Sequence, residues 1–256
     1  MAITTANLVA EWHGSYATGT GPNSNGAAAT RDTWVDICGV YDLTASGCAW
    51  SAGNGEWAGA GTAGDPYCFI SDGVDAKFTK MFTHDNPINL DGAWTIEMWA
   101  YPVDKDSDKS LISLWDDDGN SNIFTRSITT TGYFNYYYND AAANASSNTS
   151  TARGDITGAW KHLVVTYASE TLAVYVNGTA GSGASFAGWA DPWTASIDTV
   201  EIASSCSHRI SVVRMYSAEL SSGDVTNNYN AGILANASSV GAPGFTGITV
   251  IRDVHA

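Results

Sequence analysis

Short apolar segments separated by polar turns run along most of the chain from residue 67 onward. The segments are rich in Val, Ile, Phe, Trp and Tyr and are bounded by Asp, Gly or Asn, which is the pattern of β-strands joined by turns. We expect strands over Cys68–Ile70, Lys77–Phe78, Trp94–Tyr101, Leu111–Trp115, Asn122–Ile128, Tyr133–Tyr138, Trp160–Tyr167, Thr171–Asn177, Asp198–Ala203 and Arg209–Tyr216. Only Ala218–Gly232 has the pattern of a helix, with Gly232 at a C-terminal cap position. The sequence therefore predicts an all-β protein with one short helix.

The pattern within two of these segments predicts how they pair. Residues 171–177 alternate between apolar and other positions and end in Asn177-Gly178, a strong signal for a tight hairpin. In residues 160–167 both faces are apolar or aromatic, as in a central strand that is covered on both sides. We therefore expect these two segments to be neighbours in one sheet.

The remaining parts of the chain lack a periodic apolar pattern. Long loops are predicted over residues 13–33, 44–66 and 139–159, with Trp34, Trp50 and Trp57 as isolated tryptophans near the N-terminus. After Gly232 the chain contains Ile248–Ile251, a strand-like run outside the main set. The predicted domain spans residues 1–232. Residues 233–256 form an extension that is either a last strand or an arm that contacts another subunit.

Composition and charge exclude several classes of protein. Hydrophobic residues make up 44% of the 256 residues and charged residues only 14%, which suits a globular core rather than a disordered chain. The net charge of -15 repels phosphate backbones and anionic membrane surfaces, so we expect no nucleic-acid partner. No apolar run is long enough to span a bilayer, and no signal peptide is visible at the N-terminus.

Several segments taken together resemble a known family. In order and spacing, three of them are similar to the concanavalin A-like lectin/glucanase and laminin-G-like jelly rolls: Trp94–Pro102, Trp160–Tyr167 with Val174–Gly178, and Arg209–Gly232. Upstream, Trp34–Asp36, Tyr41–Leu43 and Gly73–Asp75 resemble the opening strands of the family, so the similarity covers about residues 7–232. The resemblance implies a sandwich of two antiparallel sheets that takes ligands on a concave face or at loops along its rim. It does not choose among lectins, hydrolases, adhesion modules and viral surface proteins.

Glycan hydrolysis requires two carboxyl groups on one surface. Glucanases that resemble this fold carry them on one strand as Glu-x-Asp-x-x-Glu or Glu-x-Asp-x-Glu, and the sequence has neither motif. Glu97 has only Trp99 and Tyr101 as its successors on the same face of its strand. His162 lies in a predicted central strand, where a structural role is expected rather than that of a base. We therefore expect no enzymatic activity and keep an atypical glycan hydrolase as the lesser alternative.

The acidic turn at residues 115–122 is the sharpest local candidate for a metal site. Oxygen donors occupy alternate positions there: Asp116, Asp118, Asn120 and Asn122. Carboxylates with this spacing on a turn converge on hard cations such as Ca²⁺, although the pattern is not an EF-hand because Gly119 is not at the sixth loop position. An ordinary acidic hairpin turn is the alternative. Asp72 and Asp75 are weaker calcium candidates.

Aromatic and amide side chains provide the candidate contacts to sugar, because pyranose rings stack on aromatic faces and their hydroxyls bond to polar side chains. Alternation over residues 133–139 places one such set on a single face: Tyr133, Asn135, Tyr137 and Asn139. Phe134, Tyr136 and Tyr138 belong to the opposite face. A second candidate pair, Trp189 and Trp193, lies in a predicted loop. The alternative is that the tyrosines fill the core and the tryptophans cover one end of the sandwich.

The four cysteines are Cys38, Cys48, Cys68 and Cys206, and they form no C-x-x-C pair, so a zinc site is poorly supported. Cys38 and Cys48 bracket a short segment. A disulfide between these two residues and free buried thiols both fit the sequence.

The sequence as a whole predicts a non-catalytic, lectin-like carbohydrate-binding or adhesion module that binds a glycan or cell-surface polysaccharide, with Ca²⁺ as a candidate cofactor. The low lysine content, the absence of a visible secretion signal and the adhesive fold favour a virion surface, as in a phage decoration or fibre protein, or another extracellular location. The extension is expected to contact other copies of the chain or other virion proteins. A purely structural assembly protein without glycan binding is the alternative.

Overall fold

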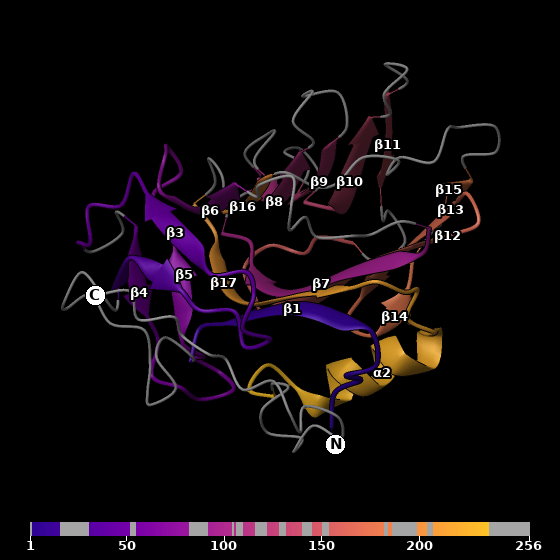
Figure 1. Cartoon of the computed structure of the whole chain (residues 1–256), viewed down its shortest axis with the longest axis horizontal. Coiled ribbons are helices and arrows are strands. Elements are labelled where there is room, and N and C mark those ends of the chain that lie inside the picture. Colours follow the sequence, from indigo (N-terminus) through magenta and orange to yellow (C-terminus); the bar gives the residue numbers. More distant parts are fainter. Residues whose placement is uncertain are drawn as a thin grey trace, which may run out of the picture.

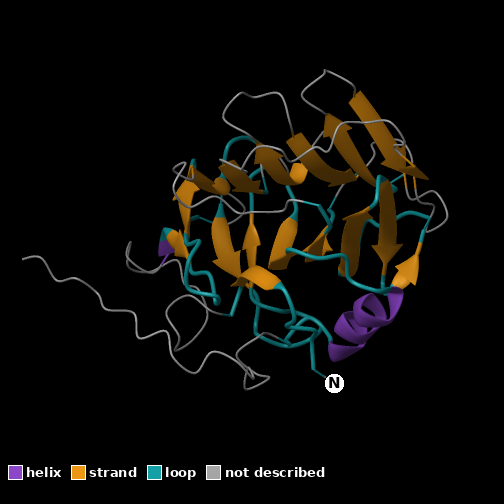
Figure 2. Cartoon of the chain, turned by 45° about the vertical axis from the view of Figure 1, so that its right-hand side comes forward, coloured by secondary structure: helices purple, strands orange, loops and turns teal. Residues whose placement is uncertain are grey.

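Two antiparallel β-sheets face each other, and one helix lies against the outer side of one of them (Figures 1 and 2). The computed structural model describes residues 2–15, 31–51, 55–81, 92–103, 105, 110–115, 122–127, 132–139, 145–149, 154–181, 184–185, 199–203 and 207–235. It describes only the backbone at residues 122–127, 135, 137–139, 145–149 and 184–185. The nine-stranded sheet is called sheet A here and the eight-stranded sheet is called sheet B.

Sheet A is built from β1 (Leu8–His13), β4 (Glu56–Ala58), β5 (Cys68–Ile70), β7 (Trp94–Tyr101), β12 (Lys161–Ala168), β13 (Thr171–Val176), β14 (Thr179–Ala180), β15 (Ala184–Ser185) and β17 (Arg209–Tyr216). Its strands follow the order β14-β13-β12-β7-β17-β5-β4, with β1 also paired to β17 and β15 to β13. The long central strands β12, β7 and β17 come from distant parts of the sequence, which is typical of a jelly roll.

Sheet B is built from β2 (Thr33–Trp34), β3 (Leu43–Ser46), β6 (Lys77–Met81), β8 (Ser110–Trp115), β9 (Asn122–Ser127), β10 (Phe134–Asn139), β11 (Ala145–Thr149) and β16 (Thr199–Ile202). These strands follow the order β11-β10-β9-β8-β16-β6-β3-β2. The predicted sandwich of two antiparallel sheets is therefore confirmed.

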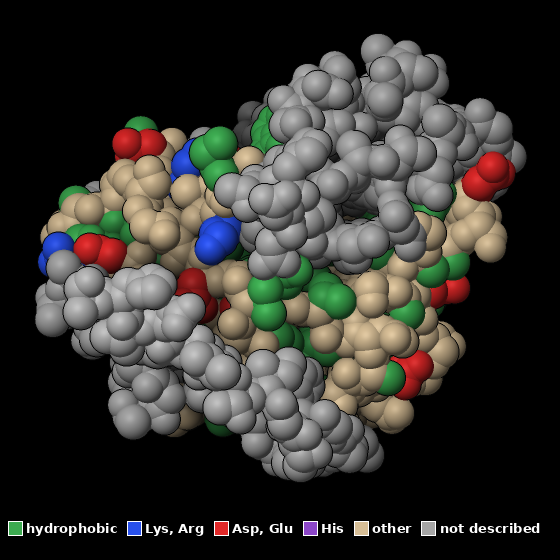
Figure 3. All heavy atoms as spheres, in the orientation of Figure 1, with side chains coloured by type: hydrophobic (Ala, Val, Ile, Leu, Met, Phe, Trp, Pro, Cys, Tyr) green, Lys and Arg blue, Asp and Glu red, His purple; other side chains and the backbone are tan. Residues whose placement is uncertain are grey.

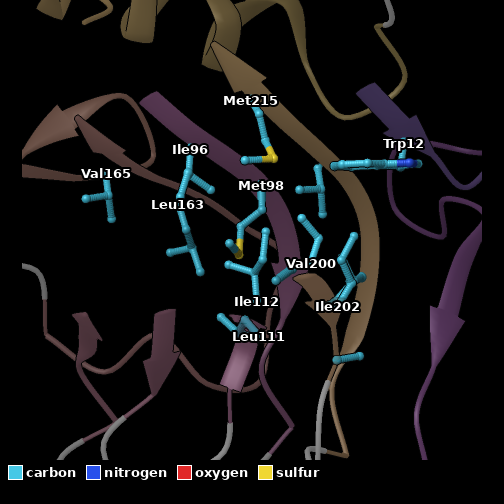
Figure 4. Close-up of a cluster of buried hydrophobic side chains, with 14 of the residues drawn as sticks. Trp12, Ile96, Met98, Leu111, Ile112, Leu163, Val165, Val200, Ile202 and Met215 are labelled. Atoms are coloured by element: carbon cyan, nitrogen blue, oxygen red, sulfur yellow. The ribbon is translucent and has the colours of Figure 1, made fainter. Parts of the chain in front are cut away.

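The core lies between the two sheets, where the inward side chains of both meet (Figure 4). From sheet A the figure shows Trp12, Ile96, Met98, Leu163, Val165 and Met215; from sheet B it shows Leu111, Ile112, Val200 and Ile202. All of these side chains are buried. Because side chains alternate along a strand, the residues between them on β7, β12 and β17 point to the outer face of sheet A.

The long N-terminal loops that the sequence predicts contain buried aromatic residues and short strands. Trp34 and Trp57 are buried and make an edge-to-face contact with ring centroids 5.1 Å apart. Phe69 and Phe78 pack edge to face beside them at 4.8 Å. The prediction of loops decorated by isolated tryptophans is therefore wrong for β3 and β4. These two strands are too short to show an apolar period, and β4 has a single core residue, Trp57.

Three other sequence predictions are corrected by the backbone. The strands β1 and β11 were not predicted, and β11 lies within the expected loop over residues 139–159. The segment Gly73–Asp75 is a turn and not an opening strand. Asp72 shapes this turn, because its Oδ1 accepts hydrogen bonds from the backbone N–H groups of Val74, Asp75 and Ala76. This oxygen therefore stabilises the turn.

The predicted pairing of residues 160–167 with residues 171–177 is confirmed, since β12 and β13 are antiparallel neighbours. Their connection is Ser169-Glu170, and both residues have a positive φ (49° and 59°). This geometry could not be predicted from the sequence, because neither residue is Asn or Gly. Asn177-Gly178 forms the following turn, which leads from β13 to β14.

The helix α2 (Ser222–Ala231) is shorter than the predicted span of 218–232. It begins late because Ser221 caps its N-terminus in a capping box with Asp224. It ends as predicted at Gly232, whose N–H bonds to the carbonyl oxygens of Asn228 and Tyr229. In the described part of the chain, no helix is long and apolar enough to cross a membrane.

Three of the four cysteines lie within the described residues, and all three are free thiols: Cys38, Cys48 and Cys68. Of the two alternatives for Cys38 and Cys48, the free thiols are the ones observed. Burial raises the pKa of the Cys38 thiol to about 12 and that of the Cys48 thiol to about 11. Both are therefore protonated and unreactive at neutral pH.

The contact between the Asn177-Gly178 turn and α2 yields a stability prediction. Gly178 has a φ of +72°, and a Cβ there would lie 3.0 Å from the Cβ of Tyr229 on α2. Gly158 has nearly the same φ, +74°, but a Cβ there would meet nothing within 4 Å. We expect Gly158→Ala to cost about 1 kcal/mol of backbone strain and Gly178→Ala to cost about 1–3 kcal/mol more because of the added crowding. Urea unfolding of the two variants checks this, and equal losses would contradict it.

Candidate functional site

The outer face of sheet A divides into two parts. One part is covered by α2 and by residues 232–235, which follow the helix. The other part is the end of the sheet where β5 and β7 finish and β12 and β17 begin; it carries the partly exposed side chains Tyr101, Trp160 and Arg209. These three residues are called the rim.

The covered part contains a row of fully buried charges. Glu11 on β1, Arg214 on β17 and Glu97 on β7 lie opposite one another in adjacent strands, and all three are 0% exposed. Nε of Arg214 donates to Oε1 of Glu11 at 2.9 Å, and Nη1 donates to Oε1 of Glu97. The remaining nitrogen, Nη2, donates to the backbone carbonyl of Ala235. One guanidinium thus joins two strands and the segment that follows α2.

Polar side chains around Glu97 complete this network. Nδ2 of Asn228, on α2, donates to Oε2 of Glu97 at 2.6 Å, and the hydroxyl of Tyr216 donates to the same oxygen at 3.3 Å. Nε2 of His162 lies 3.2 Å from Oε1 of Glu97. Oδ1 of Asn228 accepts from the backbone N–H of Thr4 at 2.7 Å. The buried side chain of Asn228 therefore ties the helix both to the charged row and to the N-terminal segment.

The electrostatics of this network hold its groups in fixed protonation states. Burial raises the pKa of Glu97, but the positive charge of Arg214 and the hydrogen-bonding neighbours outweigh it, and the pKa falls to about 2. Burial raises the pKa of Tyr216 well above its usual range, as does the charge of Glu97. Glu97 is therefore ionised and paired, and neither it nor Glu11 is exposed to a substrate. This pair of carboxylates is structural.

The rim combines aromatic surface with a positive charge. The rings of Tyr101 and Trp160 lie 5.8 Å apart at 76°, and the guanidinium carbon of Arg209 lies 5.2 Å from the centre of the Tyr101 ring. Tyr101 and Arg209 are register partners in neighbouring strands. Trp160 also packs against the buried cluster of Trp99, Val212 and Ile233. The result is an angled aromatic surface with a cation at one side.

Hydrogen bonds between loops fix the position of the rim. The buried His208 accepts from the backbone N–H of Val103 at Nδ1 (3.2 Å), and its carbonyl accepts from the N–H of Ser71 at 3.3 Å. The N–H of Gly158 donates to the carbonyl of Pro102 at 2.9 Å. The segments that follow β5 and β7 are thus tied to those that precede β12 and β17. The rim side chains stand on a rigid frame, as a binding site requires.

The segments that follow β7 and precede β12 also carry a small polar group, and one predicted sugar contact lies beside it. Nζ of Lys105 lies 2.5 Å from Oδ2 of Asp155. The hydrogen bond from Lys105 and those from Thr157 lower the pKa of Asp155 to about 2. A Cβ at Gly132 would lie 2.2 Å from Oδ1 of Asp155, so Tyr133, the next residue, is held close to this ion pair. Tyr133 is partly exposed.

Of the predicted site residues, only Tyr133 has a side chain that the structure describes. Phe134 and Tyr136 on β10 are 0% exposed and face the core, which confirms the alternation in which Tyr133 belongs to the opposite face. The other predicted side chains lie outside the described part of the chain: Asn135, Tyr137, Asn139, Trp189, Trp193, Asp116, Asp118, Asn120 and Asn122. Within the described residues, no three His, Cys, Asp or Glu side chains are close enough together to hold a metal ion.

The charged row and the rim were not found by sequence analysis. Tyr101 was recognised only as a same-face neighbour of Glu97, and Arg209 only as the start of a strand. A β-bulge between Ile210 and Val212 decides the orientation of Arg209, because Val212 and not Ser211 pairs with Trp99. The period-two pattern of the sequence carries no signal for that extra residue.

The comparisons with known proteins agree with this architecture. A family model described as the concanavalin A-like lectin/glucanases superfamily, Laminin_G_3, matches residues 72–226, which is more than half of the chain. The chain belongs to this superfamily. No curated protein sequence matches this laminin-G-like domain.

Solved structures with the same fold are distant in sequence. A Trypanosoma rangeli sialidase in complex with sialic acid matches with a TM-score of 0.60 and 16% identity, over 90% of this chain and 34% of the sialidase chain. The botulinum neurotoxin serotype D binding domain matches with a TM-score of 0.62 and 13% identity, over 88% of this chain and 52% of the other. A complex of the serotype D ligand-binding domain with N-acetylneuraminic acid gives 0.60 and 13%, over 88% and 51%. The laminin-G-like domain therefore spans between a third and about half of these neighbours.

The buried row predicts a large difference between two ion pairs of this domain. Arg214→Met leaves Glu11 and Glu97 buried without a cation, so we expect a loss of about 3–5 kcal/mol in the free energy of unfolding. The matched control is Lys77→Met, which removes the cation paired with the partly exposed Glu201 on sheet B. The control should cost about 1 kcal/mol or less. Urea unfolding measures the loss of stability in both variants. Similar losses would show that the charge of Arg214 is no more important for stability than that of a partly exposed lysine.

The domain should also lose stability in mild acid because of His13. Burial and the nearby charge of Arg214 lower its pKa from 6.5 to about 3. As the pH falls below 6.5, His13 becomes protonated in the unfolded chain but stays neutral in the folded chain. This difference lowers the free energy of unfolding. We expect a loss of about 2 kcal/mol from this residue between pH 7.5 and pH 5. Glu97 adds little in that window, since its unfolded pKa is near 4.5.

The control for this pH dependence is His13→Gln, which keeps a donor for the carbonyl of Ile233 without a titratable ring. Urea unfolding at pH 7.5 and pH 5 gives the change for each protein. The variant should show the smaller change. An equal loss of stability in the wild type and the variant between pH 7.5 and pH 5 would show that His13 does not cause the acid sensitivity.

Proposed function

We propose that this domain is a non-catalytic carbohydrate-binding module that takes its sugar at the rim. The observation that carries the proposal is the partly exposed pair of Tyr101 and Trp160 beside the guanidinium of Arg209. Sugar rings stack on aromatic faces, and a small number of fixed polar groups bond to their hydroxyls. The rim offers both on a frame that is fixed by hydrogen bonds. Tyr133, which directly precedes β10, adds a further partly exposed aromatic residue near the Lys105–Asp155 pair.

The structural neighbours support the choice of first ligands. Two of them, the Trypanosoma rangeli sialidase and the botulinum neurotoxin serotype D domain, were solved with sialic acid or N-acetylneuraminic acid. At 13–16% identity the likeness extends to the fold and not to a conserved site. Sialylated glycans are therefore the first class to test here.

The non-catalytic part of the proposal is supported by the buried carboxylates. A glycosidase needs two carboxyl groups that reach the scissile bond. Glu11 and Glu97 come together in the fold, but both are withdrawn from solvent and paired with Arg214. Calcium at the 116–122 turn and a place on a virion surface stay proposals that rest on the sequence.

A glycan array tests the proposal with the wild-type protein and with Tyr101→Ala, Trp160→Ala and Tyr101→Phe. We expect each alanine variant to weaken binding by roughly 10-fold, because loss of one stacking ring costs about 1–2 kcal/mol. Tyr101→Phe keeps the ring and should keep most of the binding. Thermal unfolding confirms that each variant is folded.

Other outcomes of the same array have distinct meanings. Binding that is unaffected by the alanine variants but lost on substituting Asp116 and Asp118, or in EDTA, would move the site to the acidic turn. A folded wild-type protein that binds no glycan would reject carbohydrate binding and favour a structural assembly protein. Release of reducing sugar from a bound glycan would reject the non-catalytic assignment.

A further inference from the structure

We infer that the rim selects sugars that carry a carboxylate and that Arg209 is the residue that recognises it. This inference rests on the proposed carbohydrate-binding function and adds the substrate class and the specificity-determining residue. It starts from an electrostatic difference between Arg209 and the other cations of the described chain.

Most of the described cations are already neutralised by acidic partners: Arg31 by Asp32, Lys77 by Glu201, Lys105 by Asp155, and Arg214 by Glu11 and Glu97. Within the described residues, Arg209 makes no ion pair, and its guanidinium lies on the Tyr101 ring instead. Lys80 and Lys161 also lack an ion pair there, but neither belongs to the rim. Lys80 is on sheet B, and Lys161 shares the parity of the core-facing residues of β12.

The described register neighbours of Arg209 are uncharged. Across the sheet it is flanked by Tyr101 on β7 and by Ile70 on β5, and Ile70 separates it from Glu56 on β4. The chain has a net charge of -15, yet no described acidic side chain forms an ion pair with Arg209. A ligand carboxylate supplies the missing anion.

The geometry of the group suits a carboxylate. A guanidinium that stacks on a ring keeps the N–H groups at its edge free for a ligand, and a planar fork of donors matches the two oxygens of a carboxylate. The Tyr101 ring restricts the motion of the side chain, so less entropy is lost on binding. A pyranose ring placed on Tyr101 and Trp160 would bring a carboxyl substituent within reach of Arg209. The same arrangement serves sialic and uronic acids, which share this group.

The net negative charge of the domain makes the local cation decisive. Long-range repulsion disfavours every anionic ligand, so an acidic sugar binds only where a short-range pair offsets that repulsion. A neutral sugar does not experience this repulsion and has no carboxylate to pair with Arg209. Substitution of Arg209 should therefore affect acidic ligands selectively.

The test is a calorimetric or NMR titration with two matched pairs of ligands. These are the methyl glycosides of N-acetylneuraminic acid and of glucuronic acid, each beside its carboxyl-reduced alcohol. The proteins are the wild type, Arg209→Gln, Arg209→Lys and Tyr101→Ala. The inference predicts that the wild type binds at least one acidic sugar roughly 10-fold or more tightly than its alcohol. It predicts that Arg209→Gln abolishes this preference, because the acid loses much more affinity than the alcohol, whereas Arg209→Lys keeps part of the preference.

The outcomes separate this inference from the proposed function. Equal binding of acid and alcohol by the wild type, or a preference that survives Arg209→Gln, overturns the inference and leaves carbohydrate binding intact. An equal loss for both ligands in Arg209→Gln also overturns it, since it assigns Arg209 a merely supporting role for the Tyr101 ring. Tyr101→Ala should weaken acid and alcohol alike. If the folded wild type binds none of the ligands and no glycan on the array, both proposals fail.

Discussion

A fully buried guanidinium, that of Arg214, constrains the outer face of sheet A more than any other group in the described chain. A charge removed from water is tolerated only where opposite charges and hydrogen bonds surround it. Arg214 meets this condition through Glu11 and Glu97 on the flanking strands and through the carbonyl of Ala235. Strand β1, strand β7 and the segment after α2 must all be in place at once. The position of the helix is therefore a consequence of the charge as well as of the apolar contacts beneath it.

This constraint determines which part of sheet A remains available to a ligand. The helix contributes Asn228 to the charged row, while Ile233 packs beside Trp99 and Val212. Together they cover the sheet as far as Trp160. Beyond Trp160 no helix of the described residues covers the sheet, and the partly exposed rim begins. One side of the Trp160 ring packs against the buried cluster under the helix, and the ring also stands at an angle to Tyr101. Trp160 is therefore the residue at the boundary between the covered surface and the candidate binding surface.

The central strands of the fold could be predicted from the sequence because they are long and rich in apolar and aromatic residues. The observed β7 and β17 have the predicted bounds, and β12 and β13 pair as expected. The peripheral strands could not be predicted, since a strand such as β4 has a single core residue and therefore no period. The charged row was hidden for a different reason. In the sequence, Glu11, Glu97 and Arg214 are isolated polar residues. Only the pairing register of β1, β17 and β7 shows that they lie opposite one another.

The rim shows why the candidate site was harder to predict than the fold. Strict alternation along β17 would place Arg209 on the same face as Val213 and Met215, which are both in the core. A lone arginine there would be a buried charge without a partner, which a stable core does not tolerate. The bulge at Ser211 inserts one residue and turns Arg209 to the outer face, where it meets Tyr101. It is held by two hydrogen bonds, one from the Ser211 hydroxyl to the carbonyl of Tyr67 and one from the N–H of Gly14 to the carbonyl of Ser211. A local irregularity in one strand thus moves a cation from the interior of the sandwich to a surface that a ligand can reach.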